Sequence, residues 1–217
     1  AVLQLAIDEA ANSDVIMVSG TCQGVQSRMV GGRVISQTAL ITKSLTLAGG
    51  YDSSFSNNPA TDPVTTTLDA RELGRTLVVT GPVSVIVSNF TLTSGDAAGL
   101  GGGPGDAHAG GALYHYGSLL LLEGMTIVDN QATYGGGIYS FGGEIRWQNI
   151  PSIIEGNSAL TGGGGVYLNG GTPFISGVDF EGNTATGGGA VYNAGASTTF
   201  SRTHFISNTA SMGGVLY

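Results

Sequence analysis

The sequence predicts an all-β fold, a single-stranded right-handed parallel β-helix with three short strands in each coil of about 25 residues. Three observations support it: an aliphatic–tyrosine pair that recurs five times, a row of asparagines with nearly the same period, and glycine runs between the two. Glycine occurs 38 times in 217 residues, and charged residues make up only 10%. The glycines follow no Gly-X-Y period, which excludes collagen.

The aliphatic–tyrosine pairs form the first periodic row, and their tyrosines lie 25, 28, 25 and 25 residues apart. These pairs are Leu113-Tyr114, Ile138-Tyr139, Val166-Tyr167, Val191-Tyr192 and Leu216-Tyr217. The second row is spaced at 27, 26 and 25 residues and consists of Asn130, Asn157, Asn183 and Asn208. Helical repeats of about 33 to 47 residues are longer than this period, whereas three short strands with their turns fit within it.

The glycine runs, the asparagine row and the tryptophan are each expected to have a structural role. Glycine runs at residues 135–137 and 162–165 are expected to form corners, where a positive φ or close backbone approach requires glycine. Stacked asparagine side chains are expected to hydrogen-bond from one coil to the next, and we favour this ladder over a catalytic or ligand-binding role. Trp147 alternates with Ile145 on one face of the segment 144–148 and is expected in the core.

The first hundred residues are less regular. Residues 1–12 predict a short N-terminal capping helix, because their apolar residues share one helical face and an exposed solenoid end needs a cover. The β-helix is expected to occupy residues 13–217 as one domain. Apolar patterns predict strands at residues 14–18, 39–48, 66–69, 76–80 and 83–93. The composition of residues 51–63 and 94–111, rich in Gly, Ser, Asn, Asp and Pro, predicts two protruding loops.

Charge and apolar runs restrict the partners. A net charge of −8 would repel phosphate backbones, so no nucleic acid is expected to bind. The longest aliphatic run, residues 119–122, is too short to cross a bilayer. Cys22 is the only cysteine and is expected to be a small buried apolar residue, with pairing outside this segment as the alternative. We expect further coils after residue 217 in a longer parent chain, or a partner chain that covers this end.

Two recurring motifs carry a family resemblance. Phe180-Glu-Gly-Asn183 and Phe205-Ile-Ser-Asn208 alternate with Gly110-Gly-Ala-Leu113 and Gly188-Gly-Ala-Val191. This alternation resembles the repeats of polymorphic outer-membrane proteins and related bacterial β-helix surface proteins. The opening residues 3–20, followed by Thr21-Cys22-Gln23-Gly24, look like the first segment of pectin-lyase-like β-helices. The resemblance implies a secreted or cell-surface bacterial protein that adheres or coats, often within a longer polypeptide.

The tyrosine row is the only periodic candidate for contact. Because the residue before each tyrosine is aliphatic and expected to point inward, alternation would send the tyrosine outward. The resulting stack could be a platform for glycans or protein surfaces, and comprises Tyr114, Tyr139, Tyr167, Tyr192 and Tyr217. The alternative, which we favour, is that these rings stack on each other only to stabilise the coils.

No catalytic, cofactor-binding or metal-ligating residues are assigned. Hydrolysis of a glycan needs two facing carboxylates, and the only acids on adjacent coils are Glu155 and Glu181, which we interpret as a solvated edge. His115 and His108 are expected to be packed or solvated, and the calcium-binding pattern that ends at Asp106 is one residue short and never repeats.

We therefore expect a non-catalytic structural or adhesive module, without cofactors, that contacts glycans, surface proteins or copies of itself. The alternative is a polysaccharide lyase or glycoside hydrolase of the pectin-lyase-like type, with its site on residues 51–63 or 94–111 or on coils outside this segment.

Overall fold

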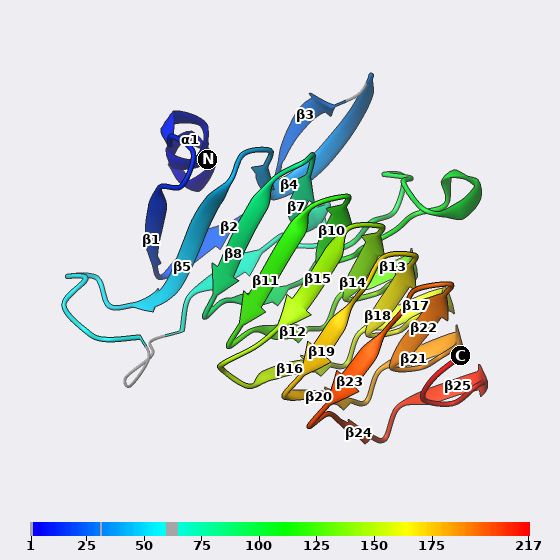
Figure 1. Ribbon diagram of the computed structural model, residues 1–217. Helices are drawn as coiled ribbons and strands as arrows, with labels where there is room; N and C mark the ends of the chain where they lie inside the picture. The colour runs from blue at the N-terminus through cyan, green and yellow to red at the C-terminus, as the bar shows by residue number, and fades with distance from the viewer. Residues whose placement is uncertain (1, 31, 60–64) are drawn as a thin grey trace.

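A computed structural model describes residues 2–30, 32–59 and 65–217, and its strands stack into a parallel β-helix that confirms the predicted fold class (Figure 1). Successive coils place equivalent strands side by side, which builds three sheets of seven strands and one of four. Among the described strands, every pairing is parallel except that of β3 with β4. Successive coils therefore add along one direction, perpendicular to the strands.

Each sheet collects one strand from each of its coils, except that sheet C takes both strands of the β3–β4 hairpin. Sheet A contains β1 Val15–Ser19, β5 Leu45–Tyr51, β8 Ser84–Ser88, β11 Leu119–Glu123, β15 Glu144–Trp147, β19 Phe174–Ser176 and β23 Thr199–Ser201. Sheet B contains β2 Thr21–Gln23, β6 Thr67–Asp69, β9 Thr91–Thr93, β12 Thr126–Val128, β16 Ser152–Glu155, β20 Val178–Glu181 and β24 His204–Ile206.

The remaining two sheets complete the coils. Sheet C contains β3 Gln26–Val30, β4 Arg33–Ile41, β7 Arg75–Thr80, β10 Leu113–Tyr116, β14 Ile138–Phe141, β18 Val166–Asn169 and β22 Val191–Ala194. Sheet D contains β13 Gln131–Tyr134, β17 Ser158–Gly162, β21 Thr184–Gly187 and β25 Thr209–Met212. Coils from β13 onward thus carry a fourth strand where three were predicted, because the segment after each ladder asparagine is extended and pairs with its copy in the next coil.

Sequence patterns located strands better than the corners between them. Strands lie at the predicted segments 14–18, 66–69 and 76–80. The predicted strand 39–48 is wrong as one element, because a corner at residues 42–44 separates β4 from β5. The predicted strand 83–93 is likewise two strands, β8 and β9, since Asn89 adopts a φ of 58° between them. The antiparallel hairpin of β3 and β4 was not predicted.

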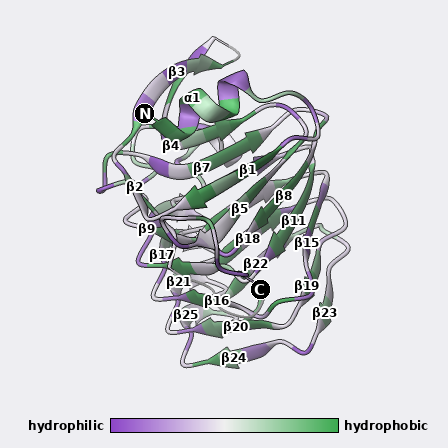
Figure 2. Cartoon of the chain, turned by 90° about the vertical axis from the view of Figure 1, so that its left-hand side faces the viewer, coloured by the Kyte–Doolittle hydropathy of each residue, from purple (hydrophilic) through white to green (hydrophobic). Residues whose placement is uncertain are grey.

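Inward-pointing aliphatic and aromatic side chains fill the space between the sheets. Trp147 and Phe180 are fully buried in this central core, which confirms the expectation for the tryptophan. Figure 2 shows hydrophobic residues concentrated along the stacked strands, among them β5, β8 and β11. Each coil therefore adds apolar side chains to one continuous core.

One α-helix, α1 Val2–Glu9, covers the first coils, as predicted. Leu3 and Ile7 pack into the central core. Between them, the buried side chain of Gln4 pairs with the backbone of Leu40: its Nε2 donates to the carbonyl O at 3.0 Å, and its Oε1 accepts from the amide N at 2.6 Å. The helix thus supplies both apolar cover and hydrogen bonds to β4.

The predicted asparagine ladder is confirmed. The Nδ2 atom of Asn130 donates to Oδ1 of Asn157 at 2.9 Å, and Asn157 donates in the same way to Asn183 at 3.0 Å. Asn183 donates to Asn208 at 2.9 Å. Each Oδ1 atom also accepts from the backbone N–H of the asparagine in the preceding coil, so one side chain joins two coils at two points.

The corner glycines are needed because backbones meet there. A Cβ atom placed on Gly164 would lie 2.4 Å from the carbonyl O of Gly189 and 2.5 Å from that of Thr184. No side chain fits at such a distance. The glycine runs therefore allow successive corners to stack directly on one another.

The two predicted loops have different structures. Residues 52–59 leave the coil after β5 and are organised around Asp52, whose carboxylate accepts hydrogen bonds from Ser54 and Ser56, while residues 60–63 lie outside the described residues. The second loop contains a short 3₁₀ helix, Pro104–Asp106, and projects beside sheet C in Figure 1. It also returns to the coil, since Tyr114 donates its hydroxyl hydrogen to the carbonyl O of Gly102 at 3.2 Å.

Candidate contact surfaces

The tyrosine row is stacked but is not an open platform. Its ring centroids lie 5.7, 5.4, 4.8 and 4.8 Å apart from Tyr114 to Tyr217. The row lies outside the central core, as alternation predicted, and its first four tyrosines belong to a separate apolar cluster. Tyr139 and Tyr167 nevertheless have exposed fractions of only 1% and 5%. The platform interpretation of the whole row is therefore wrong, and the stabilising interpretation fits.

Sheet D and the loop 94–111 cover the tyrosine row, and the sequence pattern did not predict this. Tyr134 packs edge-on against Tyr167 at 5.1 Å, and a Cβ on Gly162 would lie 2.8 Å from the ring of Tyr192. Burial raises the pKa of Tyr167 to about 12. Tyr114 and Tyr192 are half-buried, and Tyr217 is exposed.

His115 points into the coil between two outward tyrosines and is fully buried. Its Nε2 lies 3.1 Å from the carbonyl O of Ser118, and its Nδ1 lies 2.8 Å from Oγ of Ser140. A carbonyl can only accept, so Nε2 carries the hydrogen and Nδ1 accepts from the serine hydroxyl. Burial lowers the pKa of His115 to about 4, so this packed histidine is neutral.

This histidine predicts a specific acid sensitivity. The unfolded chain binds a proton near the ordinary His pKa of about 6.5, whereas the folded protein binds it only near pH 4. As pH falls from 6.5 to 4 the unfolded state holds more protons, so stability is lost through this window. Between pH 7.5 and 4.5, the unfolding free energy from urea titration should fall by about 2 kcal/mol more in the wild type than in His115→Gln. Equal losses in the two proteins would contradict this assignment.

A smaller aromatic stack is exposed beside the tyrosine row. Tyr116 and Phe141 have their centroids 5.2 Å apart and their planes 4° apart, with exposed fractions of 46% and 41%. This pair shows no period in the sequence, because the same column of sheet C continues with Asn169 and Ala194. One sequence signal does mark the pair. Tyr116 follows Tyr114 by two residues, and Phe141 follows Tyr139 by two residues.

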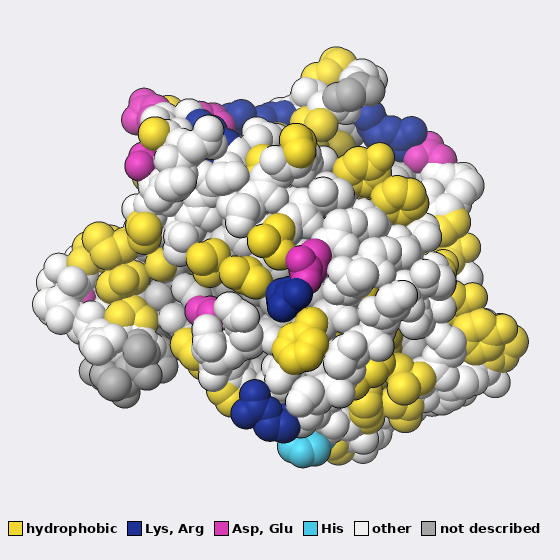
Figure 3. Space-filling view, in the orientation of Figure 1, with side chains coloured by type: hydrophobic (Ala, Val, Ile, Leu, Met, Phe, Trp, Pro, Cys, Tyr) yellow, Lys and Arg dark blue, Asp and Glu magenta, His cyan; other side chains and the backbone are white. Residues whose placement is uncertain are grey.

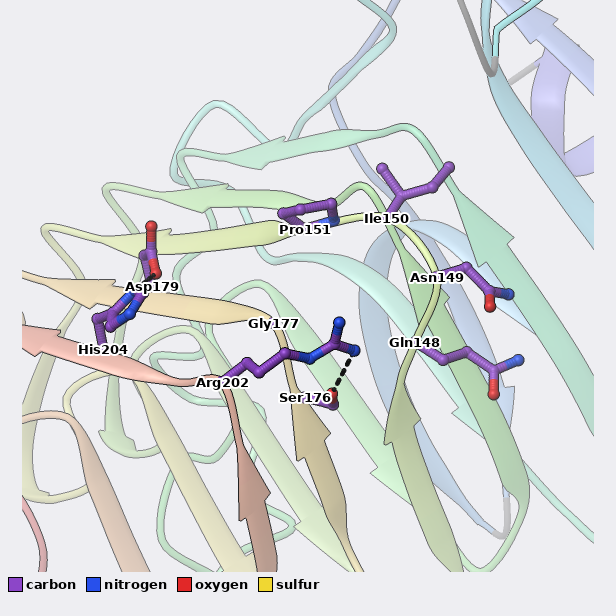
Figure 4. Close-up of a pocket in the computed structure, with 9 residues that line it drawn as sticks. All are labelled: Gln148, Asn149, Ile150, Pro151, Ser176, Gly177, Asp179, Arg202 and His204. Atoms are coloured by element: carbon purple, nitrogen blue, oxygen red, sulfur yellow. Dashed lines mark hydrogen bonds and ion pairs between the residues drawn. The ribbon is translucent and has the colours of Figure 1, made fainter.

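A cavity of about 270 Å³, with several polar residues in its lining, lies at the corner between sheets A and B (Figure 4). The turn of residues 148–151 forms one wall, and residues of the next two coils form the other. Nη2 of Arg202 donates to Oγ of Ser176 at 3.3 Å. Asp179 and His204 are paired in register on β20 and β24, with Oδ1 and Nδ1 2.7 Å apart.

A second hollow of about 260 Å³ adjoins the first across Ile150 and Pro151, which line both. Its other walls include Asn89, Thr91 and Thr126. We call the two hollows together the corner groove. It runs along several coils and offers amide, hydroxyl, carboxylate and guanidinium groups in sequence, which suits an extended polar ligand.

The other candidate residues form no common site. Glu155 and Glu181 are register partners on adjacent coils, as expected, and both are exposed. His108 accepts a hydrogen bond from the backbone N–H of Gly99 through Nδ1 at 3.1 Å, and Asp106 pairs with Arg33. In the described part of the chain, no three His, Cys, Asp or Glu side chains gather in a group that could hold a metal ion. Cys22 is a free, half-buried thiol packed against the core, and burial raises its pKa.

The fold and its internal ladders define a repeat-built parallel β-helix protein. Residues 177–194 match the family model of the Chlamydia polymorphic membrane protein (Chlamydia_PMP) repeat. This segment spans β20, β21 and β22 and includes both motifs on which the resemblance rested. The match points to a bacterial outer-membrane or surface protein. No curated protein and no solved structure matches the chain. Within the described residues, no helix is both long and apolar enough to cross a membrane.

Proposed function

We propose that this chain is a non-catalytic structural and adhesive module of a secreted or cell-surface protein, which contacts glycans or protein partners. One observation carries the proposal: the repeating asparagines and tyrosines contact their own copies in neighbouring coils, while the non-repeating polar side chains line an open groove. Such a molecule is a rigid scaffold whose specificity lies in the variable positions.

The corner groove is the contact surface that we propose. Its two hollows lie on the same corner of neighbouring coils and share the wall of Ile150 and Pro151. An extended glycan could place polar groups against Gln148, Arg202 and Thr126 while its ring faces contact the apolar wall. The regular spacing of coils near 4.8 Å, which is about the length of one sugar residue, supports a linear chain laid along the axis.

A binding assay tests this function. The protein is applied to an array of neutral and acidic glycans, and each positive ligand is titrated against Arg202→Ala. The variant should bind about fivefold or more weakly, since a charged hydrogen-bond donor is lost from the groove. Arg146→Ala is the matched control, because this arginine pairs with Glu144 on sheet A and does not line the groove. Absence of any glycan or protein ligand, or equal loss in both variants, would count against the proposal.

A second candidate, a polysaccharide lyase of the pectin-lyase-like type, is favoured by one observation in the same groove. The Asp179–His204 contact uses Nδ1 and leaves Nε2 of the histidine available as a base, while Arg202 could hold a uronate carboxylate. Incubation with acidic polysaccharides would then release unsaturated products that absorb near 235 nm, and His204→Gln would abolish them. Binding without such products would exclude this candidate.

A further inference from the structure

We propose that a second cavity, formed by sheet C, the β3–β4 hairpin and the loop 94–111, binds a pyranose ring that carries a carboxylate, such as a hexuronate unit of a glycan. The proposal deepens the adhesive function by naming a ligand class, but it concerns a site separate from the corner groove. The cavity has a volume of about 230 Å³, enough for one sugar ring.

Three chain segments that are distant in sequence build the cavity. The hairpin contributes Val30 and Ile35 to one wall, and Leu100 and Gly102 of the loop form the opposite wall. Side chains of β7 and β10 form the floor, and they are Arg75, Val78, Thr80, Tyr114 and Tyr116. Apolar walls around a few polar groups are typical of small-ligand sites.

The cavity occupies the next position in the exposed aromatic stack. Phe141 covers one face of Tyr116, and the register partner on the other side is Thr80. Threonine is too short to cover an aromatic ring, so this face of Tyr116 borders the cavity. With coils about 4.8 Å apart, a sugar ring placed there would set its C–H face against the free face of Tyr116, as sugars do on aromatic side chains.

The cavity that borders the free face of Tyr116 also contains a positive charge, that of Arg75. Arg75 has an exposed fraction of 2%, and its guanidinium lies 4.8 Å from the ring centroid of Tyr114. Its Nε and Nη2 donate to the carbonyl O atoms of Ala109 and Gly101 at 2.8 and 2.7 Å. No carboxylate among the described residues forms an ion pair with it. A buried cation without a counter-ion is costly, which favours an anionic ligand.

A second arginine lies at the cavity. Arg33 lines it from the hairpin and pairs with Asp106 of the loop, so Arg75 is the guanidinium at the cavity that has no ion-pair partner among the described residues. Burial lowers the pKa of Arg75 to about 10, consistent with a charge that lacks compensation. Five of the seven Lys and Arg residues fall within positions 28–75, and Figure 3 shows basic side chains gathered at this upper end of the molecule. Acidic side chains lie at the same end, so the uncompensated positive charge is confined to the cavity, where Arg33 pairs with Asp106 and Arg75 has no ion-pair partner among the described residues.

A ring that stacks on Tyr116 and an anion near Arg75 together define the ligand. A neutral sugar would leave the buried charge uncompensated, and a simple carboxylate would leave the aromatic face uncovered. An acidic pyranose satisfies both, and its hydroxyls can reach Oγ1 of Thr80 at the floor.

The test uses the whole chain and two matched probes, methyl β-D-glucuronide and methyl β-D-glucoside, titrated by NMR. The glucuronide should bind about tenfold more tightly than the glucoside, because only it carries the charge. Tyr116→Ala should weaken glucuronide binding about fivefold, and Arg33→Gln should weaken it by a similar factor. Phe55→Ala and Arg146→Gln remove an exposed aromatic ring and an exposed arginine elsewhere, and should leave binding unchanged.

Three results would overturn the proposal: equal binding of the two glycosides, tighter binding of phenylacetate than of the glucuronide, or equal losses in the site variants and their controls. Arg202→Ala separates this site from the corner groove. If Arg202→Ala leaves glucuronide binding unchanged and Tyr116→Ala weakens it, the glucuronide binds at the second site. This conclusion holds whatever the corner groove binds.

Discussion

Asn157→Ala is expected to lower the free energy of unfolding by about 3 kcal/mol. The side chain is fully buried in the middle of the ladder and takes part in four hydrogen bonds. Alanine would leave the backbone N–H of Asn130 and the carbonyl O of Ile127 without these partners inside the coil. Unfolding in urea followed by circular dichroism measures the loss.

Asn208→Ala is the matched comparison in the same row. Its side chain is only half-buried, so water can replace part of what is lost, and a decrease of about 1 kcal/mol is expected. A loss at Asn157 no greater than that at Asn208 would mean that the ladder contributes little to joining the coils.

Gly164→Ala is expected to destabilise the protein by more than about 3 kcal/mol, because two carbonyl O atoms lie within 2.5 Å of the added Cβ. These atoms belong to the backbone of the next coil, so relief requires the coils to separate. The same urea titration gives the change, and a reduced yield of folded protein would be an equally direct sign.

Gly170→Ala provides the control for glycine as a residue type. Gly170 has a φ of 69°, and nothing lies within 4 Å of its missing Cβ. Only the cost of a left-handed alanine is expected there, about 1 kcal/mol. If both substitutions cost the same, conformational freedom rather than close packing would explain the corner glycines.

The features predicted correctly are those that recur in several successive coils. The asparagine ladder and the corner glycines each satisfy a geometric demand that returns about every 25 residues, so the residue type returns as well. Helix α1 could be predicted because a solenoid end needs an apolar cover. The hydrogen bonds of Gln4 to β4 could not be predicted, because the sequence does not indicate which backbone groups a polar residue on an apolar helical face will contact.

Features that depend on one coil only were missed. The tyrosine row was correctly placed outside the core, but its burial results from Tyr134 and from the loop 94–111. Neither feature recurs with the period of the repeat, so the sequence pattern did not indicate them. The β3–β4 hairpin interrupts the repeat. For the same reason, the cavity beside Tyr116 was invisible, since its three walls come from this hairpin, from the loop and from sheet C. In this solenoid the periodic residues predict the stacked coils, whereas the candidate binding sites are formed by segments that depart from the repeat.

Distances along one column of sheet B test the central claim, the stacking of coils in register, most directly. From Gln23, register pairing reaches Glu155, Glu181 and Ile206 through successive neighbours. Spin labels at Gln23 and at each of these exposed positions, in a Cys22→Ser background, should give distances that rise in equal steps, about 19, 24 and 29 Å. Unequal steps, or broad distributions without a common increment, would contradict the parallel β-helix on which every proposal above depends.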